Sequence, residues 1–248
     1  MSGHSKWSTI KRKKGAEDAK RGKLFTRLAR DITLAARSGG DVDANPTLRT
    51  AVDKARAANM PKDNIDRAIK KGTGELAGGE LEEIMYEAYG PHGIPILIKC
   101  LTDNRNRAIA ELRRVFNKMG GSLAEAGAVN WMFTTKGFIT IERTDQDPDD
   151  VFMIAVDAGA DDVEVGDETF EIYTEPDQLH AVAGALSDNG LNIDDAELAP
   201  IPNNEIEIGP KETKQVMGII EMLEEIDDVQ QVYSGLAISD TVLAELAA

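Results

Sequence analysis

The chain has 248 residues, of which 42% are hydrophobic and 29% charged, and its formal net charge at pH 7 is −16. This length predicts two or three domains with real apolar cores. Cys100 is the single cysteine, which excludes an internal disulfide framework and favours a reducing compartment. No apolar run is long enough to cross a membrane and no secretory signal is recognisable, so we expect a cytoplasmic protein with no membrane partner.

Positive charge is concentrated near the N-terminus. Residues 1–74 contain 18 Lys and Arg against 8 Asp and Glu, a net charge of +10. The other residues, with 10 cations and 36 acids, carry −26. Residues 1–16 lack apolar periodicity and are rich in Ser, Gly and Lys, which predicts a basic, mobile arm. This asymmetry is typical of a basic module that binds an anion, joined to acidic modules that do not.

Residues 17–74 are predicted to form a basic domain of three helices. Apolar residues recur every three or four positions in the first helix, which ends at Gly39-Gly40. Asn45-Pro46 supplies an N-cap and a first-turn proline for the second helix. The third helix begins near Pro61 and ends with cations followed by Gly72, a typical stop signal.

A glycine-rich linker at residues 75–80 precedes strands that alternate with helices. Residues 134–202 contain a complete set of βαββαβ elements, and the segments on either side contain only part of a set. We therefore expect a discontinuous α/β domain, residues 81–133 and 203–248, with a second α/β domain inserted at 134–202. The predicted fold is α+β and multidomain: an N-terminal three-helix domain plus two ferredoxin-like α/β domains, one inserted in the other.

Catalytic and metal-binding constellations are scarce. The histidines, His4, His92 and His180, are scattered, and no spacing of Cys, His and acidic residues matches a metal site. No P-loop, nucleophile elbow or dinucleotide-binding glycine motif is present. Cys100 follows apolar residues in a predicted strand, which indicates a buried structural thiol. We expect no enzymatic activity, no metal and no cofactor.

Paired aspartates recur where a predicted helix meets a strand, in AGADDVEV, NGLNIDDAEL and EEIDDVQQV. Carboxylate pairs can serve metal binding or acid–base chemistry. In acidic loops at helix ends they are more typical of turns in contact with solvent. We interpret these pairs as solvated turns.

The basic face of the first helix is more informative. At 100° per residue, most of its cations lie in one arc apart from the apolar residues, whereas Arg21 lies on the apolar side. A solvated charged face is the alternative, but the adjacent run Lys11–Lys14 favours nucleic acid, because phosphate binding needs several cations along one track. Trp7 either stacks on an unpaired base or anchors the arm to the helices. The predicted nucleic-acid-binding residues are Lys6, Trp7, Lys11, Arg12, Lys13, Lys14, Lys20, Arg21, Lys23, Arg27, Arg30 and Arg37.

Arg105 and Arg107 form a candidate secondary anion site. Asp103 or Asn104 can cap the helix that follows, which places both arginines in its first turn. Cations are electrostatically unfavourable at this end of a helix. Either they bind an anion, or they pair with acidic residues nearby, and the ion pair is the favoured interpretation.

Several segments together resemble the YebC/PmpR family. They are MSGHSKWSTIKRKKGAEDAKRGKLFTRLARDI, NPTLRTAVDKARAANMPKDNIDRAIKKGTGE, YEAYGP, DNRNRAIAELR and VYSGLAIS, and the resemblance runs nearly end to end. It implies a helical N-terminal domain followed by two α/β domains, one inserted in the other. The family is commonly labelled as probable transcriptional regulators that bind DNA. A mitochondrial relative is a translational activator of cytochrome oxidase, and bacterial relatives are linked to ribosomes stalled on proline runs.

The resemblance also marks individual positions. Those that match the family's motifs are Gly3, His4, Ser5, Lys6, Trp7, Lys14, Asp18, Arg21, Lys23, Phe25 and Arg27, and then Asp103, Asn104, Arg105, Asn106 and Arg107. Three departures stand out. His92 precedes Gly93 where the family has paired glycines, Ala108 replaces the usual threonine, and Pro95 lies in an expected strand, which predicts an edge strand or a bulge.

Three hypotheses for the function follow. The leading one is a non-enzymatic, nucleic-acid-binding regulator of gene expression, labelled by its family as a DNA-binding transcriptional regulator. The alternative is a ribosome-associated translation factor that binds ribosomal RNA and relieves stalled elongation. The second alternative is an acidic protein-interaction module. The basic face is poor in Asn, Gln and Ser, which indicates phosphate rather than base contacts, and Trp7 favours RNA.

Overall fold

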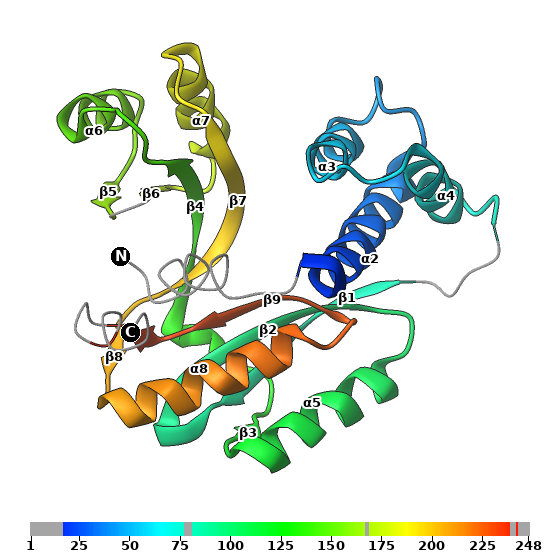
Figure 1. The fold of residues 1–248 in the computed structure, drawn as a ribbon, viewed down its shortest axis with the longest axis vertical. Coiled ribbons are helices and arrows are strands. Elements are labelled where there is room, and N and C mark those ends of the chain that lie inside the picture. Colours follow the sequence, from blue (N-terminus) through cyan, green and yellow to red (C-terminus); the bar gives the residue numbers. More distant parts are fainter. Residues whose placement is uncertain (1–16, 77–80, 167–168, 239–241, 243–248) are drawn as a thin grey trace. The chain divides into compact units, whose positions relative to one another are not determined.

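The computed structural model describes residues 17–76, 81–166, 169–238 and 242. They are α+β, as predicted, and group into two compact units, which Figure 1 labels element by element. One unit is built from residues within Lys14–Ala126 and from Lys214–Val232. The other is built from Gly127–Thr213 and from residues within Tyr233–Ala248. Within the described residues, no helix combines the length and the apolar character that crossing a bilayer requires.

The N-terminal helices have the order that the sequence predicts. They are α2 (Glu17–Ala35), which continues into the 3-10 turn η1 (Ala36–Ser38), α3 (Pro46–Ala57) and α4 (Lys62–Gly72). The Asn45 cap is confirmed, because its side-chain oxygen accepts a hydrogen bond from the Leu48 N–H at 3.1 Å. Ile32, Leu48 and Val52 are almost completely buried in the shared core.

The same unit contains a four-stranded sheet in the order β3-β1-β2-β9. Its strands are β1 (Glu82–Tyr89), β2 (Pro95–Thr102), β3 (Ser122–Leu123) and β9 (Val229–Ser234). The helices α5 (Arg105–Met119) and α8 (Pro210–Glu224) lie beside this sheet (Figure 1). Gln215 of α8 donates a hydrogen bond to the Met119 carbonyl at 3.2 Å, which places α8 beside the end of α5.

The β1–β2 hairpin corrects one prediction. β2 lies between β1 and β9, so Pro95 is not in an edge strand. The pairing of β2 with β1 shows no bulge. Pro95 is instead the first residue of β2, a position where a strand tolerates proline. His92 and Gly93 both have positive φ, 61° and 77°. His92 therefore adopts the left-handed conformation that explains why a glycine suits this turn.

The second unit contains a βαββαβ arrangement, which confirms the predicted ferredoxin-like elements. In chain order they are β4 (Phe133–Glu142), α6 (Pro148–Asp157), β5 (Asp162–Val165), β6 (Thr169–Thr174), α7 (Leu179–Asp188) and β7 (Ile193–Pro202). The sheet order is β5-β6-β4-β7, with antiparallel pairs throughout. Ile139, Phe170 and Val182 are fully buried in its core. A short parallel pair, β8 (Ile206–Glu207) and β10 (Leu236–Ala237), completes the unit.

Candidate nucleic-acid interface

Half of the predicted nucleic-acid-binding residues lie outside the described part of the chain. These are Lys6, Trp7, Lys11, Arg12, Lys13 and Lys14. Lys20, Arg21 and Lys23 lie on the first two turns of α2, where the structure describes the helix but not these side chains. Their part in binding therefore stays a prediction.

The last three predicted cations contact backbone carbonyls of their own unit. Arg27 donates a hydrogen bond to the Glu224 carbonyl, and Arg37 donates one to that of Leu81. Arg30 donates one to the Asp227 carbonyl. Burial lowers the pKa of Arg27, although the nearby carboxylate of Glu224 acts in the opposite direction. These arginines thus connect α2 and η1 to the end of α8, to the turn after it and to the residue before β1.

Asp228, in the turn between α8 and β9, is the centre of a buried ion cluster. The residue is 1% exposed. Its carboxylate lies 2.8 Å from a guanidinium nitrogen of Arg30 and 2.9 Å from one of Arg107, and it accepts a hydrogen bond from the Thr102 hydroxyl at 3.1 Å. We call these four residues the Asp228 cluster. The interpretation of this aspartate pair as a solvated turn is wrong for Asp228, because partners from α2, β2 and α5 replace its water.

Arg105 and Arg107 are both engaged with carboxylates. Asn104 caps α5, with its side-chain oxygen 3.0 Å from the Arg107 backbone nitrogen. Arg105 pairs with Glu82 of β1, and Arg107 lies 2.9 Å from Asp103 as well as from Asp228. The hydrogen bonds that Arg107 donates to Asp228 and Asp103 raise the pKa of Arg107, and the one to Asp103 lowers the pKa of that carboxyl. The structure thus contains the local ion pairs that the sequence favoured.

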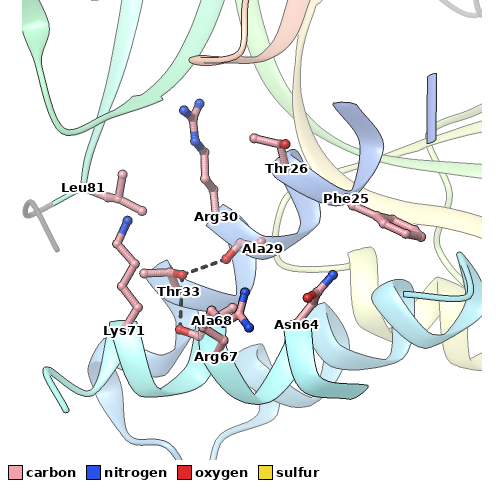
Figure 2. Close-up of a pocket in the computed structure, with 10 residues that line it drawn as sticks. All are labelled: Phe25, Thr26, Ala29, Arg30, Thr33, Asn64, Arg67, Ala68, Lys71 and Leu81. Carbon is pink, nitrogen blue, oxygen red and sulfur yellow. Dashed lines mark hydrogen bonds between the residues drawn. The ribbon is translucent and has the colours of Figure 1, made fainter. Parts of the chain in front are cut away.

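A groove of about 380 Å³ lies between α2 and α4 (Figure 2). We call it the α2–α4 groove; it is lined by Phe25, Thr26, Ala29, Arg30, Thr33, Asn64, Arg67, Ala68, Lys71 and Leu81. The Thr33 hydroxyl donates towards the carbonyls of Ala29 at 2.7 Å and Ala68 at 3.2 Å. The two helices therefore touch through small side chains and a shared hydroxyl, and longer polar side chains line the opening.

Gly72 shows how closely the helices approach at one end of the groove. A Cβ added at Gly72 would lie 2.3 Å from the Thr33 carbonyl oxygen and 2.6 Å from the Ala36 Cβ. No larger residue fits there without moving one helix. The glycine that the sequence marks as a helix stop therefore also sets the spacing of α2 and α4.

The groove contains two cations that are not among the predicted nucleic-acid-binding residues. Asn64, Arg67 and Lys71 rise from α4 on one face (Figure 2), as their spacing of three and four residues requires. Neither Arg67 nor Lys71 forms a hydrogen bond or an ion pair with the part of the chain that the structure describes, although the charge of Lys71 contributes to the lowered pKa of Asp103. The guanidinium of Arg30, in contrast, points away from α4 (Figure 2). The spacing Asn64-x-x-Arg67-x-x-x-Lys71 is visible in the sequence. The sequence does not show that α2 packs opposite these residues and forms the other wall of the groove.

The described residues offer little for catalysis. Cys100 lies fully buried in β2, and burial raises the pKa of its thiol to about 12. A thiol in this state forms almost no thiolate near neutral pH, so it is a poor nucleophile. Among the residues described, no three His, Cys, Asp or Glu side chains come together as a metal site would require.

The fold and the charge pattern define a class of protein: α+β, multidomain, with a basic helical N-terminal part ahead of acidic α/β parts. The family model described as the TACO1/YebC protein N-terminal domain matches residues 5–75. The model described as the TACO1/YebC second and third domain matches residues 81–236. The chain belongs to the TACO1/YebC family, which confirms the resemblance seen in the sequence.

Similar proteins extend over the whole chain. A probable transcriptional regulatory protein of Desulfatibacillum aliphaticivorans is 52% identical over 246 residues, which cover 99% of this chain and all of the relative. A protein of the same name from Geobacter sulfurreducens is 50% identical, over 99% of this chain and all of the relative. The crystal structure of a conserved hypothetical protein from Aquifex aeolicus matches with a TM-score of 0.84 at 41% identity, covering 90% of this chain and 93% of that one. The relatives' names support a family of transcriptional regulators.

Proposed function

We propose that this protein is a non-enzymatic, nucleic-acid-binding regulator of gene expression that binds DNA through its basic arm and α2. The observation that carries the proposal is the net charge of +10 on residues 1–74, against −26 on the others. Phosphate backbones attract such a segment and repel the acidic remainder, so contact is limited to the N-terminal part. The names of the relatives support the same function.

The contacts of the α2 arginines indicate two roles among the predicted cations: some stabilise the fold and others bind phosphate. Arg27, Arg30 and Arg37 hold α2 and η1 against the α/β part of their unit. We assign them a supporting role. The direct phosphate contacts then come from Lys6 and Lys11–Lys14 in the arm and from Lys20, Arg21 and Lys23 on α2. Trp7 stacks on a base where one is unpaired.

The first test is binding as a function of salt. If about five phosphates are neutralised, the logarithm of the affinity for duplex DNA falls with the logarithm of salt concentration with a slope of roughly −4 to −5. Replacing Lys11, Arg12, Lys13 and Lys14 together by Ala should abolish binding. Each of these changes should alter stability by less than about 0.5 kcal/mol, because exposed substitutions seldom cost more.

A control variant carries the same change of charge elsewhere. It replaces four exposed cations of α5 and α8 by Ala: Arg113, Arg114, Lys118 and Lys214. We expect this control to bind nearly as the wild type does. A salt slope near zero, or equal losses in the two variants, would overturn the assignment of binding to the arm.

Crosslinking in cells followed by sequencing identifies the nucleic acid. Enrichment of promoter DNA is the expected result. Enrichment of ribosomal RNA would indicate a function in translation, in which the same cations bind RNA phosphates instead of DNA phosphates.

A further inference from the structure

Arg67 and Lys71 line the α2–α4 groove and form no hydrogen bond or ion pair with the described residues, whereas the arginines that the structure describes on α2 do. Arg67 and Lys71 are one helical turn apart, about 6 Å along the axis of α4. Like charges at this spacing destabilise a helix slightly, and an anion bound between them reduces that repulsion. Arg30 is not available for that anion, because Asp228 holds its guanidinium at 2.8 Å.

The other walls of the groove narrow the choice of anion. Phe25, Ala29 and Ala68 supply apolar surface, and the Asn64 amide offers both donors and an acceptor. Figure 2 shows Phe25 and Asn64 towards one end of the groove and Lys71 at the other. A ligand with a flat apolar part at one end and negative charge at the other fits this arrangement.

We propose that the α2–α4 groove binds an unpaired nucleotide of a single-stranded nucleic acid. Arg67 and Lys71 bind its phosphates, and its base packs on Phe25 beside Asn64. Aromatic side chains stack on bases of any sequence, and cations follow the backbone. A base in a duplex is paired and stacked, and so cannot enter a groove between two helices. A volume of about 380 Å³ lies within the range of small-ligand sites.

This proposal rests on the proposed function and adds a preference for unpaired strands. The arm can attract any nucleic acid through its charge, whereas the groove contributes only where a base is free. A DNA region that is locally opened and an unpaired RNA loop share this chemistry.

A pair of matched double variants tests the groove. Arg67→Ala with Lys71→Ala removes the two cations that line it. Lys62→Ala with Lys70→Ala removes two exposed cations of the same helix that do not. Both variants change the net charge equally, so the difference between them measures contact rather than general attraction. Urea unfolding shows that each variant is folded.

The measurement is fluorescence anisotropy with labelled 15-nucleotide deoxythymidine and uridine oligomers, and with a duplex of equal length. We expect the groove variant to bind single strands at least about 10-fold more weakly, and its salt slope to be smaller by about 1.4, which is two single-strand phosphates. The control should lose less than about threefold. On the duplex, the two variants should weaken equally.

Photocrosslinking places the base. An oligomer with 5-iodouridine should attach to Phe25, which mass spectrometry detects on the tryptic peptide of residues 24–27. Attachment only to Trp7, on the peptide of residues 7–11, would overturn the groove assignment and leave the arm as the stacking site.

Failure of this inference differs from failure of the proposed function. If the wild type binds nucleic acid and the two double variants bind equally well, the groove is not a site but the regulator remains. If the wild type binds no nucleic acid at all, both proposals fail. If poly-glutamate competes for the groove as well as the oligonucleotides do, the proposed nucleotide is wrong and the ligand is an acidic peptide.

Discussion

The Asp228 cluster and the α2–α4 groove both use basic residues, and Arg30 belongs to both. In the cluster the cations meet a buried carboxylate, so their charge is compensated inside the protein. In the groove Arg67 and Lys71 have no such partner among the residues described. A count of cations on a helix face therefore does not identify a binding surface. The partner of each cation decides whether it stabilises the fold or is available to a ligand.

Removal of the carboxylate should have the largest effect on stability. Asp228→Ala leaves Arg30 and Arg107 without their shared partner, and removing one member of a buried pair costs about 3–5 kcal/mol. We expect a value near 3 kcal/mol, because the Arg107 side chain is 44% exposed and regains some water. The free energy of unfolding in urea measures the effect.

The neighbouring aspartate is the control for this prediction. Asp227 is exposed, and Arg30 contacts its backbone carbonyl rather than its carboxylate. Asp227→Ala should therefore change stability by less than about 0.5 kcal/mol. Similar losses for the two variants would show that Asp228 is not the centre of the cluster.

A smaller effect is expected where α2 and α4 touch. Gly72→Ala introduces a Cβ that collides with the Thr33 carbonyl and with Ala36, and such overpacking typically costs about 1–3 kcal/mol. The helices should move apart, so binding of single strands in the groove should weaken as well. Thermal or urea unfolding and the anisotropy assay measure the two consequences.

Gly22→Ala supplies a matched control in α2. A Cβ added there meets nothing within 4 Å, and the residue lies inside a helix. Replacing such a glycine by alanine should stabilise the helix by about 0.5–1 kcal/mol. Opposite signs for the two Gly→Ala changes are the expected outcome; destabilisation by both would contradict the role given to Gly72.

The smallest effect concerns pH and the outer edge of the Asp228 cluster. The hydrogen bond from Arg107 lowers the pKa of Asp103 below its ordinary value of 3.8. A carboxylate with a lowered folded pKa adds stability that is fully present above the unfolded pKa and is lost as pH falls through the folded pKa. Asp103→Asn should therefore reduce stability by less than about 1 kcal/mol at pH 7. Its difference from the wild type should vanish in acid below that pKa, and a difference that grows on acidification would contradict the sign.

The helices and the βαββαβ unit could be predicted because their signals are local. Asn45 followed by Pro46 marks a helix start in any context, since the cap bonds an N–H only three residues ahead. The prediction of an edge strand or a bulge at Pro95 was wrong for the opposite reason, because the signal is not local. Its place at the start of an internal strand depends on β9, which lies more than 120 residues later in the chain.

Local patterns in the sequence predict the α+β class, the helix boundaries near their caps, the family and the concentration of positive charge in residues 1–74. Each depends on periodicity, capping or counts within short windows. The role of each individual charge depends on the tertiary structure. Arg30 meets a carboxylate 198 residues away, and Arg67 and Lys71 face a wall supplied by α2. Burial and partnership are properties of packed surfaces, so no local pattern around Asp228 distinguishes it from the exposed Asp227 beside it.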